Sequence, residues 1–359
     1  ANSVHVMKMC AAFAKNGHEV TLYAPSVNMS DKSHIDIFDY YGVDETFCVK
    51  RVFHPSFVFG HYFYAFAVLI CLFFSKVDLI FSRNLLSLTF ASLLNIDKIL
   101  EIHQPIPITS RLQNRLFRIL IGLKHFKQLV VITKPLKSMF LSKYDISEDK
   151  ILVAPDGADI PSDLNMILPS RVKRMQVGYV GHLYSGRGIE LIIELSKICD
   201  WADFFIVGGN DSDIKRIKTL CKNLKNISVV GFLSPSKAEI FRLGMDVLLA
   251  PYQPKVGLEN SKLTTEAWMS PLKIFEYMAA TKSIICSDIP VLHEVLRHNE
   301  NCLLCKPTDL KEWKEALESL NDDKLLRERL SKQAYRDLVN KYTWKIRAQV
   351  ILNKSTIVL

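Results

Sequence analysis

Short apolar runs alternate with amphipathic segments of helical period along most of the chain. This alternation is typical of an α/β fold in which helices cover a parallel sheet. The expected strands are 18–25, 77–81, 98–103, 128–133, 176–180, 203–207, 227–233 and 284–288. The expected helices are 5–14, 61–75, 109–127, 135–143, 189–199, 271–280, 309–340 and a last one from 342. We therefore predict an α/β protein with parallel sheets.

The size and composition of the chain indicate two globular domains. Its 359 residues exceed what one ordinary hydrophobic core accommodates. Hydrophobic residues make up 49% and charged residues 23%, which is typical of a folded rather than a disordered chain. We place the linker between the two domains near residues 160–173.

The formal net charge of +9 predicts a basic surface, for which nucleic acid, an anionic membrane and anionic substrates are the possible partners. No Lys/Arg block interleaved with aromatic residues indicates a nucleic-acid groove. The charge therefore favours a membrane surface or a phosphate-bearing substrate, and no nucleic acid is expected to bind.

The eight cysteines are scattered, mostly within apolar runs, which is typical of a reduced, cytosolic protein. The C-x-x-C at 302–305 occurs once and is interpreted as a buried strand, so no metal site is expected. The chain opens on an amphipathic helix, and no signal peptide is expected.

Two segments in the first half suggest contact with a membrane. The run HYFYAFAVLICLFFS at 61–75 is apolar on all sides but is shorter than the roughly 20 residues of a membrane span. We expect a buried helix, with shallow membrane insertion as the alternative. Basic residues that would suit anionic headgroups are Lys50, Arg51, Lys76 and Arg83. The basic helix 109–127 is either a solvated face or a site for a membrane or an acceptor phosphate.

The segment 270–280 carries the clearest candidate chemistry. Ser270 is the expected N-cap of a helix whose first residue is Pro271. Lys273 and Glu276 lie three residues apart and so share a face of this helix. A helix start attracts anions, and a carboxylate beyond it can accept hydrogen bonds from a diol. One interpretation is therefore phosphate at the helix start and ribose on Glu276, and the other is a capped helix with a solvent-exposed Lys–Glu pair.

A loop with several glycines follows the strand 176–180. Gly181, Gly186 and Gly188 would let the backbone approach a phosphate closely, and Arg187 would offer a positive charge at the start of the next helix. In the other half of the chain, His103 ends a predicted parallel strand, where side chains face a ligand crevice. A lone histidine is more often structural, so both roles stay open for His103.

The runs SPLKIFEYMAA (270–280) and IICSDIP (284–290) resemble the donor-site signature of GT-B glycosyltransferases, in particular glycosyltransferase family 4, or glycosyl transferases group 1. In this resemblance Glu276 matches the second glutamate of the family's E-x7-E pair, which holds the ribose hydroxyls. Trp268 stands at the position of the first glutamate. The resemblance also implies that the backbone from Met269 to Leu272 supplies amides to the phosphates.

Two further motifs share this resemblance. The family's glycine loop usually carries an arginine after its first glycine and a lysine before its last, and His182 and Arg187 occupy these positions here. His103 resembles the family's strand histidine, which contacts the transferred sugar.

The resemblance implies a GT-B fold, in which two Rossmann-like, doubly wound domains face a cleft. Residues 1–160 would form the acceptor-side domain and residues 174–340 the domain that binds the nucleotide sugar. Part of the helix 342–359 would pack back on the first domain. The family's first sheet strand has no counterpart in the chain, so we expect that a short N-terminal piece is missing from the sequence.

The implied activity is transfer of a hexosyl group, with retention of configuration, from a UDP- or GDP-sugar to an acceptor hydroxyl of a lipid-linked or surface-polysaccharide precursor. The protein would be cytoplasmic or peripheral on the inner face of the cell membrane, with neither cofactor nor metal. The implied catalytic residues are His103, Arg187 and Glu276. The implied donor-binding residues are Gly181, His182, Gly186, Arg187, Ser270, Pro271, Leu272, Lys273 and Glu276. Two alternatives are a sugar-nucleotide epimerase of the same fold and a non-catalytic partner subunit, which Trp268 and His182 slightly favour.

Overall fold

The computed structural model describes residues 2–26, 36–57, 59–107, 109–161, 174–258, 261–264 and 266–356. The chain divides into two compact units. The N-terminal unit comprises residues 5–36, 43–155 and 345–359. The C-terminal unit comprises residues 1–4, 37–42 and 156–344.

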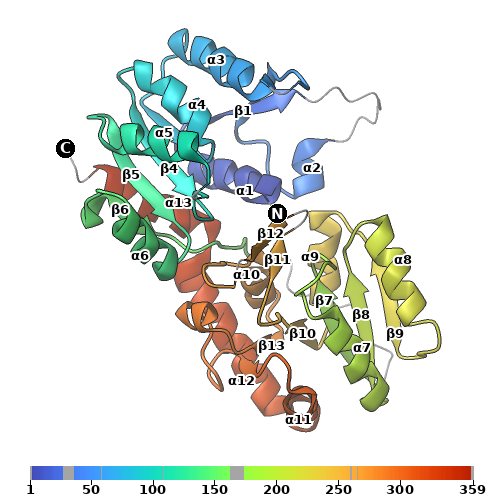
Figure 1. The fold of residues 1–359 in the computed structure, drawn as a ribbon. Coiled ribbons are helices and arrows are strands. Elements are labelled where there is room, and N and C mark those ends of the chain that lie inside the picture. The colour runs from blue at the N-terminus through green and yellow to red at the C-terminus, as the bar shows by residue number, and fades with distance from the viewer. Residues whose placement is uncertain are drawn as a thin grey trace. The chain divides into compact units, whose positions relative to one another are not determined.

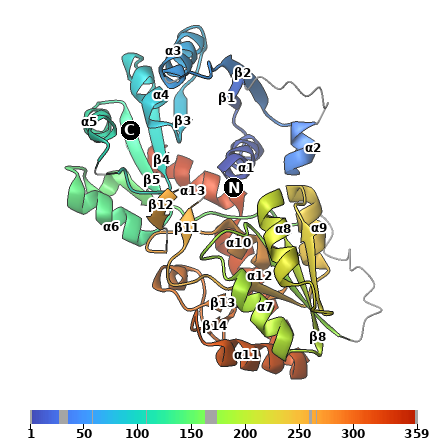
Figure 2. The ribbon, with the colours of Figure 1, turned by 45° about the vertical axis from the view of Figure 1, so that its right-hand side comes forward.

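In the N-terminal unit, four parallel strands form a sheet in the order β3-β4-β5-β6, and two more, β1 and β2, pair in parallel with each other (Figure 1). The strands are β1 (Thr21–Ser26), β2 (Cys48–Phe53), β3 (Leu79–Ser82), β4 (Asp97–Ile102), β5 (Phe126–Val131) and β6 (Ile151–Val153). The helices are α1 (Asn2–Lys15), α3 (Gly60–Phe73), α4 (Leu85–Phe90), α5 (Arg111–Ile121), α6 (Lys134–Lys143) and α13 (Trp344–Thr356). Helices α4 and α5 lie on one side of the four-stranded sheet, and α1 and α13 lie on the other (Figure 1, Figure 2).

In the C-terminal unit, six parallel strands form a sheet in the order β14-β13-β10-β7-β8-β9. They are β7 (Met175–Val180), β8 (Ala202–Val207), β9 (Ile227–Gly231), β10 (Val247–Ala250), β13 (Ser283–Ser287) and β14 (Leu303–Cys305), beside a small hairpin of β11 (Gly257–Leu258) and β12 (Ser261–Thr264). The helices are α2 (Ile37–Tyr41), α7 (Ile189–Ile198), α8 (Asp211–Leu220), α9 (Pro235–Leu243), α10 (Leu272–Ala279), α11 (Leu310–Asp322) and α12 (Lys324–Asp337). The predicted α/β class with parallel sheets is confirmed.

The six-stranded sheet separates two hydrophobic cores. Val247 and Leu249 of β10 belong to the core that also contains Trp313 of α11 and side chains of α7. Leu248 and Ala250 of the same strand belong to the other core, with side chains of α9, α10 and α12. Because helices cover both faces of the sheet, successive residues of each inner strand must be apolar. This is why short, continuous apolar runs in the sequence predict these strands.

Three expected helices differ from the observed ones. The expected helix 109–127 corresponds to α5, which ends at Ile121 because Gly122 and the turn after it lead into β5. The expected helix 309–340 is two helices, since the side chain of Asp323 caps the start of α12 by accepting the amide hydrogen of Leu326. The expectation that 61–75 forms a buried helix is wrong for one face of α3, where Phe66 is 53% exposed. Within the described residues, no helix combines the length and the apolar character that crossing a bilayer requires.

Candidate active site

The helix α10 begins one residue later than the sequence predicts. Pro271, with φ −78° and ψ 120°, is the extended N-cap residue, so the helix starts at Leu272 and has no side-chain cap. The Ser270 hydroxyl instead accepts a hydrogen bond from the Asp156 amide at 3.0 Å. Ser270 as N-cap is therefore wrong, because Ser270 lies two residues before the helix and is held by a different segment of the C-terminal unit. The Tyr277 hydroxyl accepts a hydrogen bond from the Val180 amide at 2.9 Å and so ties α10 to the sheet.

Lys273 is buried, although it shares a helical face with Glu276. Its Nζ lies 3.9 Å from the ring centroid of Tyr179 and 5.1 Å from that of Tyr252. Nζ has no hydrogen-bond partner among the residues that the structure describes. Burial lowers the pKa of Lys273 well below its usual value, and the neighbouring Arg187 lowers it further. The interpretation of a solvent-exposed Lys–Glu pair is therefore wrong for the lysine.

The glycine loop after β7 lies against this lysine. A Cβ atom at Gly181 would lie 2.8 Å from Lys273 Nζ, so a side chain there would displace the ammonium group. Gly188 has φ +75°, and a Cβ atom there would lie 1.8 Å from the carbonyl oxygen of Pro251. The Gln253 amide donates a hydrogen bond to the Gly186 carbonyl at 2.9 Å. The glycines therefore let the loop pack against the segment that follows β10.

Arg187 brings a second cation, which is half-buried, beside Lys273. Its Nη2 donates a hydrogen bond to the Tyr184 hydroxyl at 2.7 Å. Its guanidinium carbon also lies 4.8 Å from the ring centroid of Tyr184 and 5.6 Å from that of Tyr252. Since Tyr252 contacts both cations, the aromatic rings hold Arg187 and Lys273 by cation–π attraction, which partly offsets their mutual repulsion.

His182 is uncharged at neutral pH. The residue is exposed at its surface, but partial desolvation by the surrounding loop lowers its pKa to about 4, and the cations of Arg187 and Lys273 contribute to this shift. The ring stacks on Tyr184 at a centroid distance of 5.1 Å. Where the family usually has an arginine, His182 can therefore donate one hydrogen bond but offers no positive charge.

Glu276 is held by a residue that the sequence did not reveal. Arg242 of α9 lies with Nη1 3.3 Å from Glu276 Oε2, and the side chain of Arg242 is only 7% exposed. The side chain of Glu276 is 27% exposed, so its carboxylate is oriented but still accessible. The only sequence signal was a charge within the otherwise apolar run Ile240-Phe241-Arg242-Leu243, and its partner could not be read from the chain.

The structure thus brings most of the predicted site residues together in the C-terminal unit. These are Gly181, His182, Gly186, Arg187, Ser270, Pro271, Leu272, Lys273 and Glu276. Trp268 lies in the turn before them, with an intermediate exposure. His103 belongs to the N-terminal unit, directly after β4.

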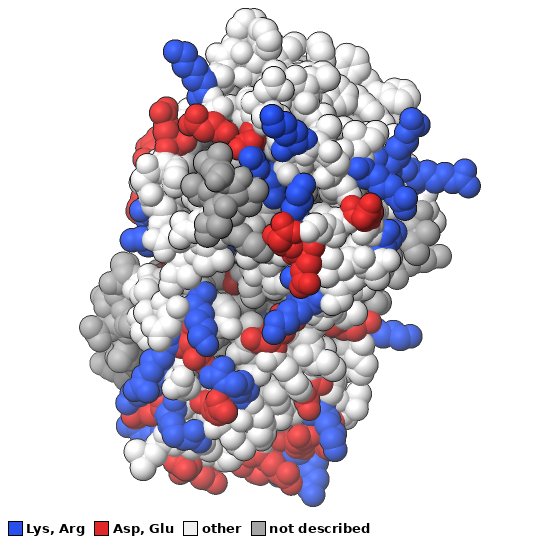
Figure 3. All heavy atoms as spheres, turned by 90° about the vertical axis from the view of Figure 1, so that its left-hand side faces the viewer, with Lys and Arg blue, Asp and Glu red and all other residues white. Residues whose placement is uncertain are grey.

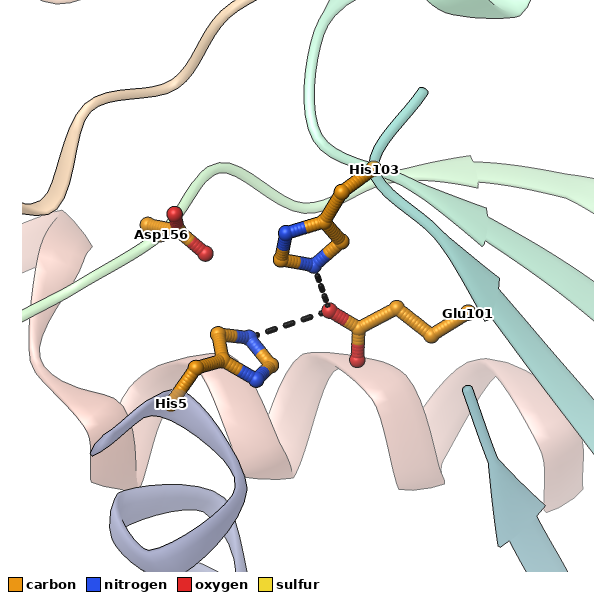
Figure 4. Close-up of side chains that lie close together, drawn as sticks. All are labelled: His5, Glu101, His103 and Asp156. Carbon is orange, nitrogen blue, oxygen red and sulfur yellow. Dashed lines mark hydrogen bonds and ion pairs between the residues drawn. The ribbon is translucent and has the colours of Figure 1, made fainter. Parts of the chain in front are cut away.

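The surroundings of His103 form a buried charge network (Figure 4). His103 Nε2 hydrogen-bonds Glu101 Oε1, and His5 Nε2 of α1 lies 3.0 Å from the same oxygen. Arg347 of α13 donates to Glu101 Oε1 from Nη2 at 2.9 Å and to the carbonyl oxygens of Pro155 and Ala154 at 2.8 and 3.0 Å. The sequence did not reveal that Glu101, two residues before His103, is joined by His5 and Arg347, which lie far from it along the chain.

This network fixes the orientation of the His103 ring. Burial alone would raise the pKa of Glu101, but Arg347, His5 and His103 hold it well below its usual range. Glu101 is therefore ionised, and its carboxylate accepts the hydrogen bond from Nε2 of His103, which leaves Nδ1 as the other polar atom of the ring.

Two groups of side chains in the structure have metal-binding chemistry. His5, Glu101 and His103 are chemically suitable ligands, but the Arg347 guanidinium already contacts both Glu101 oxygens, at 2.9 and 3.4 Å. A cation bound there would face another cation. The C-x-x-C motif contributes β14 as predicted, and burial raises the pKa of Cys302 and of Cys305 to about 12. Both thiols are protonated at neutral pH, whereas metal ligation requires thiolates.

We predict that Glu101→Gln destabilises the protein by about 3–5 kcal/mol at neutral pH, because it leaves the buried Arg347 charge without its counter-charge. Urea denaturation measures this difference. The pKa of Glu101 is lowered by folding, so its contribution is present at neutral pH and is lost as the pH falls below the ordinary glutamate range. Acidification should therefore reduce the difference in the free energy of unfolding between the wild type and the variant.

The matched control is Glu315→Gln, which removes an exposed carboxylate 3.5 Å from Lys311. This change should alter the free energy of unfolding by less than about 0.5 kcal/mol. Equal stability of Glu101→Gln and Glu315→Gln would contradict a structural role for the network.

Comparison with known proteins identifies the family. The family model described as Glycosyltransferase Family 4 matches residues 3–161, and the one described as Glycosyl transferases group 1 matches residues 165–337. Together they span nearly the whole chain.

Similar proteins agree with this assignment. The uncharacterized glycosyltransferase MJ1607 of Methanocaldococcus jannaschii is 22% identical over 63% of this chain and 59% of its own length. The O-antigen chain mannosyltransferase RfbU of Salmonella typhimurium is 24% identical over 59% of this chain and 56% of its own length. The matches thus span less than two thirds of either relative.

Among solved structures, Alr3699/HepE of Anabaena in complex with UDP is similar with a TM-score of 0.70 and 13% identity. The similarity covers 98% of this chain and 96% of that one, and it shows the GT-B fold. From the two family matches and this fold, we conclude that the chain belongs to glycosyltransferase family 4 (glycosyl transferases group 1).

Proposed function

We propose that this protein transfers a sugar, with retention of configuration, from a nucleoside-diphosphate sugar to an acceptor hydroxyl. The observation that carries this proposal is the pair of neighbouring cations, buried Lys273 and half-buried Arg187, which share the ring of Tyr252. Burying two like charges is unfavourable unless an anion joins them. The diphosphate leaving group of a nucleotide sugar is an anion of the required size and charge.

The individual roles follow from the geometry. Lys273, Arg187 and the backbone amide of Leu272, which follows Pro271, would stabilise the charge that develops on the leaving diphosphate, where a preorganised site acts most strongly. Gly181 and Gly186 would let the loop approach the phosphates, and neutral His182 would donate a hydrogen bond. No protein nucleophile is required if the leaving phosphate assists the incoming hydroxyl.

Glu276 would accept hydrogen bonds from the ribose hydroxyls of the donor. Its carboxylate is oriented by Arg242 at 3.3 Å, so it would be positioned before the nucleotide binds. His103 would contact the transferred sugar. Because Nε2 is engaged by Glu101, Nδ1 of His103 is the ring nitrogen left to form a hydrogen bond with a sugar hydroxyl.

The donor is proposed to be a UDP- or GDP-sugar. A structural neighbour binds UDP, and another structure of the same protein contains UDP-glucose. The acceptor is proposed to be a lipid-linked or saccharide precursor of a surface polysaccharide, which the name of the O-antigen mannosyltransferase supports. The net charge of +9 suits such an acceptor at the cytoplasmic face of a membrane.

A non-catalytic partner subunit is the second candidate. It is favoured by Trp268, which stands where the family has its first glutamate, and by the uncharged state of His182. The two candidates differ in turnover, since only a transferase consumes its nucleotide sugar when an acceptor is supplied. An epimerase would act on the nucleotide sugar without a separate acceptor.

We predict that the protein binds UDP or GDP with micromolar affinity and that Glu276→Ala abolishes this binding. The reason is that the variant loses the carboxylate proposed to hold the ribose. Isothermal titration calorimetry of UDP and GDP against the wild type and the variant measures these affinities. Glu318→Ala of α11, which removes a partly exposed carboxylate, is the control and should bind like the wild type. Absence of binding of either nucleotide to the wild type would refute the proposed donor site.

We also predict that nucleotide binding takes up a proton. In the free protein, burial and Arg187 lower the pKa of Lys273, and a bound diphosphate would raise it again. Affinity should therefore fall as the pH rises through the range in which free Lys273 loses its proton. Calorimetry in buffers of different ionisation enthalpy, at a series of pH values from about 7 upward where the phosphates are already ionised, measures the proton uptake.

Lys273→Met should lose both the proton uptake and most of the affinity. Lys282→Met is the matched control, because burial also lowers the pKa of Lys282, which lies just after the C-terminal end of the same helix. Binding without proton uptake by the wild type would show that Lys273 does not meet the diphosphate.

A further inference from the structure

The helix α3 exposes a continuous aromatic face. Its exposed large apolar side chains recur at helical spacing, and neighbouring ones at both ends extend the patch. We call this patch the aromatic face, and its members are Phe53, Phe57, Phe59, Tyr62, Phe63, Phe66, Ile70, Phe73 and Phe74. Exposure reaches 68% for Phe73 and 82% for Phe74. Soluble monomers rarely expose a contiguous apolar patch of this kind unless it binds something.

The opposite side of α3 is firmly packed. Tyr64, Val68 and Leu72 are buried in a core with Val52 of β2 and Ala91. The Tyr64 hydroxyl donates a hydrogen bond to the Tyr23 carbonyl of β1 at 2.9 Å. The helix is therefore held in place by one face, and the exposure of the other face is a property of the folded unit.

Within the stretch of sequence that carries the aromatic face, the charged residues have one sign. The helix itself contains no charged residue, and the sequence from Thr46 to Val77 contains no Asp or Glu. The same stretch contains Lys50, Arg51 and Lys76, all of which are exposed. In Figure 3, the upper end of the molecule, at the height of α3 in Figure 1, is largely uncharged, and both Lys/Arg and Asp/Glu side chains lie below it.

A second basic element lies close by. Helix α4 packs against both α3 and α5, so the three helices form a row in the N-terminal unit (Figure 2). Helix α5 exposes Arg111, Arg115 and Arg118 together with Leu112 and Ile119. A purely solvated basic face, which was one prediction for this helix, does not account for the apolar side chains that are exposed among the arginines.

We propose that the aromatic face docks the N-terminal unit on the surface of a bilayer that contains anionic phospholipids. The aromatic side chains insert among the headgroups and upper acyl chains, as in helices that lie in the interface plane. The flanking lysines and arginines pair with lipid phosphates. Helix α3 has 14 residues, which at about 1.5 Å each is too short for the roughly 30 Å hydrocarbon core, so it lies on the membrane rather than across it.

The charge pattern argues against a second copy of the chain as the occupant. A symmetric dimer through this face would place Lys50, Arg51 and Lys76 of two copies around one apolar interface. No acidic side chain from Thr46 to Val77 could pair with them. An anionic lipid surface supplies negative charge along this whole stretch, whereas the nearest acidic residues that a second copy has in sequence are Asp44, Glu45 and Asp78.

The proposal is independent of the donor site and is tested without nucleotide or acceptor. The whole protein is sedimented with vesicles of phosphatidylcholine alone and with vesicles of phosphatidylcholine mixed with phosphatidylglycerol. We expect binding to the mixed vesicles that weakens as salt is added. The double change Phe66→Ser and Phe73→Ser should reduce the partition coefficient by more than about tenfold, because it removes two inserted rings. The double change Lys50→Glu and Arg51→Glu should reduce binding to the mixed vesicles only.

Two matched controls come from the C-terminal unit. Leu325→Ser replaces an apolar side chain that is 79% exposed, and Lys311→Glu reverses a charge that is 83% exposed. Both should bind vesicles like the wild type. The proposal is overturned if the wild type binds neither kind of vesicle or if phosphatidylglycerol does not increase binding. It is also overturned if the double variant Phe66→Ser and Phe73→Ser binds vesicles like the wild type.

Light scattering without vesicles measures whether the protein self-associates. Self-association that the serine variant abolishes, with no vesicle binding by the wild type, would assign the face to a dimer and overturn the lipid proposal. Nucleotide titration of the same preparations separates the two hypotheses. A protein that binds nucleotide but not vesicles refutes only the membrane surface, and the reverse result refutes only the donor site.

Discussion

The buried ammonium group of Lys273 is the constraint on which the candidate site depends. A lysine can be buried without a hydrogen-bond partner only where other attractions offset the loss of hydration. Here the rings of Tyr179 and Tyr252 provide that attraction, and Gly181 leaves the room that the side chain needs. The glycine loop, the end of β10 and the first turn of α10 are therefore coupled through one cation. A substitution in any of the three would move the other two.

The two units contain buried charges of opposite character. In the N-terminal unit, Glu101 is fully surrounded by cationic and hydrogen-bonding partners, and this network joins α1, β4 and α13. In the C-terminal unit, Lys273 lies beside another cation and has no hydrogen bond to any described residue. A buried charge network whose hydrogen bonds are all satisfied stabilises a fold. A buried charge without such partners favours the binding of a ligand of opposite sign. This contrast is why the first is interpreted as support for His103 and the second as an anion site.

The sequence predicts the features of this protein that depend on local pattern. The apolar runs located the strands, because both faces of the six-stranded sheet are covered, and the spacing of Lys273 and Glu276 correctly placed them on one helical face. Prediction from the sequence failed where a contact between residues that are distant along the chain determines the structure. The hydroxyl of Ser270 could cap a helix, but the Asp156 amide, far away in the sequence, competes for it. Arg242, His5 and Arg347 could not be assigned to their carboxylates for the same reason. The functional roles of the site residues rest on the family resemblance and stay predictions.

The aromatic helix α3 shows why sequence alone leaves a further ambiguity. A helix without charges has no polar face to mark its solvent side, so its sequence is equally compatible with complete burial and with one lipid-facing side. The fold removes this ambiguity, because β2 and the segment around Ala91 occupy only the face of Tyr64, Val68 and Leu72. The remaining face is as apolar as the packed one, yet among the described residues no element covers it. A surface of this composition is stable in water only at a cost that a bilayer interface removes, and the absence of acidic residues from Thr46 to Val77 matches that interface in charge as well.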